Sequence, residues 1–149
     1  MKFFVFALLF VLTGCFEKDQ TPESALKDFI EARMGNIVTK DAVLGRVTGP
    51  MKASLESISD EEFEKSADLR NIRQDSFKVL DKECKSDKCL LTYSISYQTS
   101  HENKAAFKSE VKKVAEVQQV EGKWLISDVS NIKTFHESVE PIIMDDKAL

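Results

Sequence analysis

Residues 91–98 alternate between large apolar or aromatic side chains and smaller polar ones: Leu91-Thr92-Tyr93-Ser94-Ile95-Ser96-Tyr97-Gln98. Successive side chains of a strand point to opposite faces, so this period of two predicts a strand with one buried face. Upstream, Phe77, Val79 and Leu80 indicate another strand. The two segments together predict an antiparallel hairpin.

The hairpin has a cysteine on each side of its expected turn. Cys84 and Cys89 flank Lys85-Ser86-Asp87-Lys88 symmetrically, and a two-residue turn at Ser86-Asp87 places the cysteines directly across from each other. Cross-strand Cα separations of about 4.5–5.5 Å suit a disulfide. The C-x₄-C spacing could instead be half of a metal site, but the sequence has no second cysteine pair. We therefore predict a Cys84–Cys89 disulfide and no metal.

A second strand pair is expected from about Phe107 to Val120 and from Lys123 to Ile132, joined at Glu121-Gly122. The valines of the first segment do not keep one parity, which predicts a bend or bulge within it. Ser100 to Ala106 reads as a polar connection between the hairpins. After Phe135 the chain becomes Glu-rich, and we assign residues 136–149 to a C-terminal tail.

The segment after residue 20 has the signals of a helix start. Thr21 suits the N-cap and Pro22 the first helical position, while Gly35 suits the end. Side chains at helical spacing form one apolar stripe with an arginine at its edge: Leu26, Phe29, Ile30, Arg33 and Met34.

Three shorter helical segments are expected before the strands. Thr39 can cap the first, and Gly49-Pro50 reads as a break before a stretch from Met51 to Ile58. Ser59 and Glu62 form a capping box, in which each side chain satisfies the backbone donor of the other residue. The acidic residues here are expected to start a helix and not to catalyse a reaction.

Helices followed by an antiparallel sheet predict an α+β fold, with N-terminal helices packed on a curved antiparallel sheet of about four strands in a cone-like arrangement. Two segments carry a resemblance to small lipoproteins with a nuclear-transport-factor-two-like (cystatin-like) domain. Residues 21–30 resemble their opening helix, and Gly122-Lys123-Trp124-Leu125-Ile126 resembles their final hairpin. Members of this fold include isomerases, cyclases and dehydratases as well as non-catalytic binding domains.

The N-terminus has the features of a secretory signal. Lys2 precedes an apolar run of ten residues, Phe3 to Leu12, and the chain turns polar after Cys15. A spanning helix needs about 20 apolar residues, whereas a signal h-region has about 7–15. The first residues are therefore expected to be a signal peptide and not a membrane span.

Leu12-Thr13-Gly14-Cys15 resembles the bacterial lipobox. The resemblance implies cleavage between Gly14 and Cys15, a diacylglyceryl thioether on Cys15 and further acylation with chains such as palmitate. Two or more acyl chains anchor a protein stably to a membrane. The implied division is a signal peptide at 1–14, a lipidated tether at 15–20, a domain at 21–135 and the tail.

The implied location is the cell envelope. Phe16 stands where an Asp would retain an enterobacterial lipoprotein at the inner membrane, so the resemblance favours the periplasmic face of the outer membrane in a Gram-negative organism. With Cys15 lipidated, Cys84 and Cys89 remain as an even pair in an oxidising compartment, where disulfides persist. The formal net charge is −4, and Lys104 and Lys112-Lys113 are too sparse for a nucleic-acid-binding stripe.

No sequence motif assigns a catalytic residue or a cofactor. His101-Glu102 and His136-Glu137 lack the His-Glu-x-x-His spacing of a zinc protease and are interpreted as solvated surface residues. Tyr93, Tyr97 and Trp124 either belong to the core or line a ligand cavity.

The sequence therefore predicts a membrane-anchored envelope lipoprotein whose domain binds a protein partner or an apolar small ligand without catalysis. The alternatives are a small isomerase, lyase or hydrolase that uses a pocket of the same fold, or a structural role.

Overall fold

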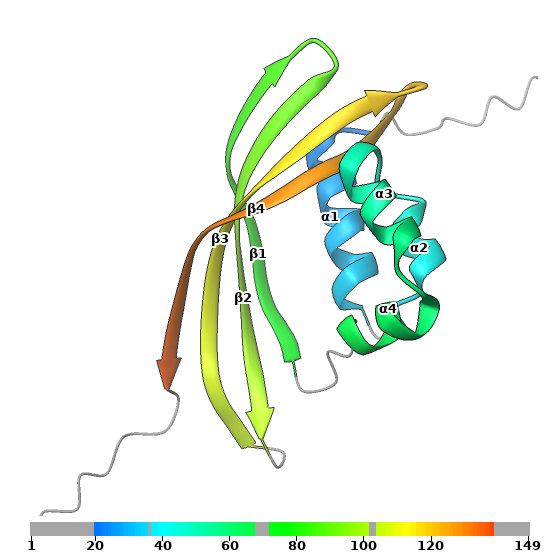
Figure 1. The fold of residues 1–149 in the computed structure, drawn as a ribbon. Coiled ribbons are helices and arrows are strands. Elements are labelled where there is room, and N and C mark those ends of the chain that lie inside the picture. Colours follow the sequence, from blue (N-terminus) through cyan, green and yellow to red (C-terminus); the bar gives the residue numbers. More distant parts are fainter. Residues whose placement is uncertain (1–19, 36, 68–71, 102–103, 139–149) are drawn as a thin grey trace, which may run out of the picture.

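The computed structural model describes residues 20–35, 37–67, 72–101 and 104–138 (Figure 1). Four helices come first in the chain: α1 (Pro22–Met34), α2 (Lys40–Leu44), α3 (Gly49–Ser57) and α4 (Asp60–Ser66). Four strands follow: β1 (Ile72–Lys85), β2 (Lys88–His101), β3 (Lys104–Val120) and β4 (Lys123–Ser138). The strands form one antiparallel sheet in the order β1-β2-β3-β4, so each strand pairs with its neighbour in sequence.

The alternating segment forms the buried face of β2, as predicted. Leu91, Tyr93 and Ile95 are all at most 4% exposed. The residues that face them across the β2–β3 pairing are Ala115, Lys113 and Val111, respectively. Ala115 and Val111 are apolar, whereas the partner of Tyr93 is a lysine on the inward face of the sheet.

The first hairpin matches its prediction in both turn and cross-link. Lys85 pairs with Lys88, which leaves Ser86-Asp87 as the two-residue turn. Cys84 and Cys89 pair directly across the hairpin, with their Cα atoms 4.1 Å apart, and their sulfurs form a disulfide. The second predicted turn, Glu121-Gly122, joins β3 to β4, and both of its residues have positive φ.

The helix starts and ends also follow the sequence signals. Thr21 is the N-cap of α1, Pro22 occupies its first turn, and Gly35 is its C-cap. Thr39 caps α2, with its side chain accepting a hydrogen bond from the Ala42 backbone. Gly49, expected to lie in a break, instead begins α3, because Pro50 is well suited to the first turn of a helix.

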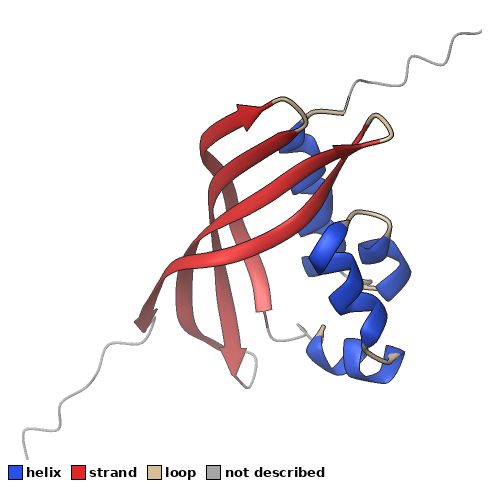
Figure 2. Ribbon diagram, turned by 45° about the horizontal axis from the view of Figure 1, so that its top comes forward, coloured by secondary structure: helices blue, strands red, loops and turns tan. Residues whose placement is uncertain are grey.

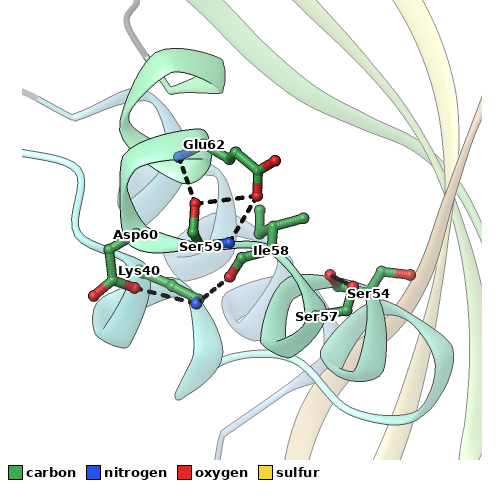
Figure 3. A network of polar contacts seen from close by, with 7 residues as sticks. All are labelled: Lys40, Ser54, Ser57, Ile58, Ser59, Asp60 and Glu62. Carbon is green, nitrogen blue, oxygen red and sulfur yellow. Dashed lines mark hydrogen bonds and ion pairs between the residues drawn. The ribbon is translucent and has the colours of Figure 1, made fainter.

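A polar network fixes the junction between α3 and α4 (Figure 3). The Ser59 and Glu62 side chains accept hydrogen bonds from each other's backbone N–H groups, which confirms the capping box. Lys40 Nζ, at the start of α2, donates to the Ile58 carbonyl at 2.6 Å and lies 3.1 Å from Asp60 Oδ1. Glu62 therefore serves the start of α4, as predicted, and Asp60 also pairs with Lys40 of α2.

Backbone hydrogen bonds connect the segment between α2 and α3 to β4, at the edge of the sheet. The backbone N–H of Thr48 donates to the Ile126 carbonyl at 2.8 Å, and the N–H of Ile126 donates to the Arg46 carbonyl at 3.0 Å. These two bonds add a short parallel bridge between Val47 and Ile126. The loop between α2 and α3 thus acts as a small extension of the sheet.

The predicted fold class is wrong. The chain is mainly a four-stranded antiparallel sheet with strands of 14, 14, 17 and 16 residues, to which four short helices are attached (Figure 2). The helices do not form the cone-like layer that the sequence predicts. They bury too little for that: α2 and α4 each bury one residue, Val43 and Phe63, and α3 buries none.

The strands are also longer than their sequence patterns indicate. The predicted polar connection at 100–106 is largely strand, since β2 continues to His101 and β3 begins at Lys104. β4 continues to Ser138, three residues beyond the predicted end of the domain at residue 135. Its end extends away from the helices, and residues 130–137 are exposed, so no apolar alternation marks them (Figures 1 and 2).

The predicted bulge lies on the neighbouring strand. β3 pairs with β2 without interruption from Phe107 to Gln118, so its mixed parity reflects apolar residues on both faces. The β2–β3 register shifts only before Phe107, between Thr99 and Ser100. Along the predicted segment the shifts occur between β3 and β4, where Ser127 and Ile132 are the extra residues of β4. Ser127 is buried and its hydroxyl donates to Glu116 Oε1 at 2.7 Å.

Three predicted features lie outside the described residues: the signal peptide, the lipobox with Gly14 and Cys15, and all of the tether except Gln20. The same holds for residues 139–149 of the predicted tail. Within the described residues, no helix is long and apolar enough to cross a membrane.

The disulfide makes a measurable prediction about stability. Replacing both Cys84 and Cys89 by serine is expected to lower the free energy of unfolding by about 2 kcal/mol, since the closed loop is short and the entropy it removes from the unfolded chain is small. Denaturant titration of the mature chain measures this. Two free thiols in the unreduced, denatured wild type would show that the bridge does not form.

Candidate functional site

A cavity of about 480 Å³ lies between the helices and the face of the sheet that β2 presents to them. Side chains from three helices and all four strands line it. The helices contribute Phe29, Ile30, Arg33, Met34, Val43, Met51, Ser54 and Leu55, and the sheet contributes Ile72, Tyr93, Ile95, Tyr97, Lys113 and Val129. A space of this size with mainly apolar walls and a few polar groups is typical of small-molecule sites.

The apolar wall arises from two sequence patterns that meet. Phe29 and Ile30 come from the apolar stripe of α1, and each is 6% exposed. Tyr93 and Ile95 come from the alternating face of β2. Helix α1 contacts β2, β3 and β4, so the stripe lies over the inward face of the sheet.

Arg33 enters the cavity from the last turn of α1. It lies seven residues after Leu26 and therefore on the same helix face as the buried apolar side chains. Burial lowers the pKa of its guanidinium, and the nearby Tyr93 hydroxyl acts in the opposite direction. The guanidinium is thus a partly desolvated cation at the end of an apolar stripe.

Lys113 enters the same cavity from β3. It is the direct cross-strand partner of Tyr93, so the two side chains lie next to each other on the inward face. Val111 and Ala115, its neighbours on that face, are buried apolar residues. Burial lowers the pKa of the Lys113 ammonium, and the charge of Arg33 lowers it further.

Tyr93 lines the same cavity as these two cations. Its side chain is 1% exposed, and its ring centroid is 5.7 Å from that of Phe77. Burial raises the pKa of the Tyr93 hydroxyl to about 12, against a smaller opposing effect of Arg33. At neutral pH the hydroxyl is therefore a neutral hydrogen-bond donor and not a base.

The described lining has positive charge without a matching negative charge. It contains no carboxylate and no histidine. Within the described part of the chain, Arg33 and Lys113 form no ion pair, and hydrogen bonds contribute to neither of their pKa shifts. Two cations side by side on apolar walls are unusual, because buried charges are normally paired.

The sequence-predicted pocket residues are only partly brought together. Tyr93 and Tyr97 line the cavity, but Trp124 does not. Trp124 packs half-buried against the core from the start of β4, and its backbone N–H donates to the Gln20 side chain at 3.1 Å. The remaining predicted pair, Cys84 and Cys89, lies at the β1–β2 turn and not among the lining residues.

The two histidines are not part of this site. His136 is exposed on β4, and its Nδ1 lies 2.7 Å from the buried Ser109 hydroxyl, with which it shares a hydrogen bond. His101 is the last residue of β2. Among the residues that the structure describes, no three His, Cys, Asp or Glu side chains gather in a way that could hold a metal ion.

Arg33 and Lys113 were not predicted as site residues, although the sequence contains a signal for both. In the sequence Arg33 lies at the edge of the apolar stripe, and Lys113 belongs to a sparse basic pair with Lys112. On β3, Lys113 has the same parity as Val111, Ala115 and Val117. A lysine in the middle of an apolar strand face is the sequence pattern that indicates a site residue at Lys113.

The fold is also found among solved structures. The solution structure of a SEC-C motif containing protein from Rhodopseudomonas palustris superposes with a TM-score of 0.55 at 10% sequence identity, over 76% of this chain and 80% of that chain. At this identity the likeness concerns the fold alone. No family model and no curated protein matches the chain, so the predicted resemblance to envelope lipoproteins remains a prediction.

Proposed function

We propose that this chain is a lipid-anchored lipoprotein of the bacterial cell envelope whose domain binds a small apolar ligand without catalysis. The cavity between the helices and the sheet supports the binding role, because its walls are mainly apolar and its size is that of known small-molecule sites. The lipobox-like tetrad Leu12-Thr13-Gly14-Cys15 supports the envelope location.

The proposed anchor is the acylated Cys15. Residues 15–20 form only a short tether before α1 begins at Pro22, so the domain is held close to the membrane surface. In a Gram-negative organism, Phe16 after the lipidated cysteine favours the periplasmic face of the outer membrane. The Cys84–Cys89 disulfide is consistent with an oxidising compartment outside the cytoplasm.

A binding role fits the cavity better than catalysis. An isomerase, lyase or hydrolase of this type would need an acid–base pair beside the substrate. The described lining offers Tyr93, whose pKa of about 12 suits a donor, but no carboxylate or histidine with which to pair it. The space is also open and not filled by core side chains, which favours a small ligand over a protein partner.

The anchor is tested by metabolic labelling. Cells that express the full chain are expected to incorporate radiolabelled palmitate into it, whereas the Cys15→Ala variant remains unlabelled and leaves the membrane fraction, because Cys15 provides the thioether sulfur. Cys84→Ala serves as the matched control and should stay labelled. A Cys15→Ala chain that remains tightly membrane-bound would contradict the proposal.

The ligand cavity is tested by filling it. Ser54 is an exposed residue of α3 whose side chain lines the cavity, whereas the neighbouring Ala53 is exposed and does not line it. Ser54→Trp is expected to weaken binding of octanol to the mature chain by about tenfold, a loss of about 1.4 kcal/mol, because the indole occupies ligand space. Ala53→Trp should leave binding unchanged.

This experiment uses calorimetric titration of the mature chain in phosphatidylcholine nanodiscs, with protein-free nanodiscs as the blank. Absence of saturable octanol binding to the wild type, or equal loss in both variants, would count against a ligand site in this cavity.

A further inference from the structure

The cavity has one chemical feature that apolar binding alone does not require. Arg33 reaches it from the apolar stripe of α1, and Lys113 reaches it from between the buried Val111 and Ala115 of β3. A lysine or arginine at such a position can place its aliphatic stem on apolar surface and its head in water. Here, however, both heads line the same space, and each has its pKa lowered by burial.

The two like charges also act on each other. Arg33 and Lys113 line the same cavity, and the charge of Arg33 lowers the pKa of Lys113, as repulsion between two cations does. No carboxylate among the described lining residues offsets this repulsion. Such an arrangement is unfavourable in the empty cavity and becomes favourable when an anion lies between the two heads.

We propose that the cavity binds a small amphiphile with one anionic head, a carboxylate or a phosphate, held by Arg33, Lys113 and the Tyr93 hydroxyl. The proposal rests on the ligand-binding function proposed above and names the ligand class. The ligand is a free single-chain molecule and not a lipid of the bilayer.

Each group of the site has a distinct part in this recognition. The planar guanidinium of Arg33 can donate two parallel hydrogen bonds to a carboxylate or phosphate. Lys113 supplies a compact positive charge, and Tyr93, next to it across the β2–β3 pairing, adds a neutral hydroxyl that would donate a hydrogen bond to the head. The apolar tail would lie against side chains such as Phe29, Val43 and Ile95.

Four ligands with eight carbon atoms each separate charge from apolar burial. We propose to titrate the mature chain in phosphatidylcholine nanodiscs with octanoate, octyl phosphate, octanol and octylammonium, using protein-free nanodiscs as the blank. The two anions are expected to bind about tenfold or more tightly than octanol, because a hydrogen bond to a charged group is worth about 1.5–3 kcal/mol. Octylammonium is expected to bind most weakly.

Matched variants assign the effect to the two cations. Lys113→Met should weaken octanoate binding by about tenfold and keep octanol binding, because methionine retains the apolar volume but not the charge. Lys112→Met is the control, since Lys112 is the adjacent, exposed residue of β3.

Arg33→Met is compared in the same way with Lys27→Met on the exposed face of α1. Retained octanol binding shows that each variant still folds.

Three outcomes would overturn the proposal. Equal affinity for octanoate, octanol and octylammonium would show that the cations do not select the ligand, while leaving the apolar binding function intact. An equal loss on Lys112→Met and Lys113→Met would place the effect outside the cavity. No saturable binding of any of the four ligands would overturn the proposed function as well.

The bilayer itself is tested as an alternative source of the anionic head. Nanodiscs that contain phosphatidylglycerol present such heads, whereas phosphatidylcholine carries no net charge. We expect the octanoate affinity, corrected with protein-free nanodiscs of the same composition, to be the same in both. A weaker affinity with phosphatidylglycerol would assign the site to a membrane lipid and contradict a free ligand.

Discussion

The structure depends on the contact between the apolar stripe of α1 and the inward face of β2 and β3. Leu26 is fully buried in this contact, and Leu91 and Ala115 are fully buried opposite each other in the sheet. Buried apolar area is the main favourable term in folding, at about 25 cal/mol per Å², so this contact holds the helices to the sheet. The bridge between Val47 and Ile126 then fixes the helices at the β4 edge.

The same contact explains why a cavity remains. Helices of 5 to 13 residues are too short to cover strands of 14 to 17 residues, and α3 buries none of its side chains. Beyond Leu26 the stripe of α1 ends in Arg33, whose charged head cannot pack into a closed apolar core without a partner. The fold therefore leaves a cavity that both Arg33 and Lys113 line.

Local features of this fold could be predicted from sequence, because each depends on a few neighbouring residues. The cap at Thr21, the capping box at Ser59 and the Cys84–Cys89 hairpin are of this kind. The length of the strands could not be predicted, since the polar ends of β2, β3 and β4 are held by sheet hydrogen bonds and show no alternation. The presence of Arg33 and Lys113 in one cavity could not be predicted either, because the two residues lie 80 positions apart in the sequence and no local pattern relates them.

The central claim is that Arg33 and Lys113 make a mainly apolar cavity selective for anions. A crystal structure of the mature chain with octyl phosphate tests it most directly. We predict the phosphate within hydrogen-bond distance of both Arg33 and Lys113, and the alkyl chain along Phe29 and Ile95. A ligand whose phosphate lies in solvent while its chain occupies the cavity, or one bound elsewhere on the sheet, would contradict the account.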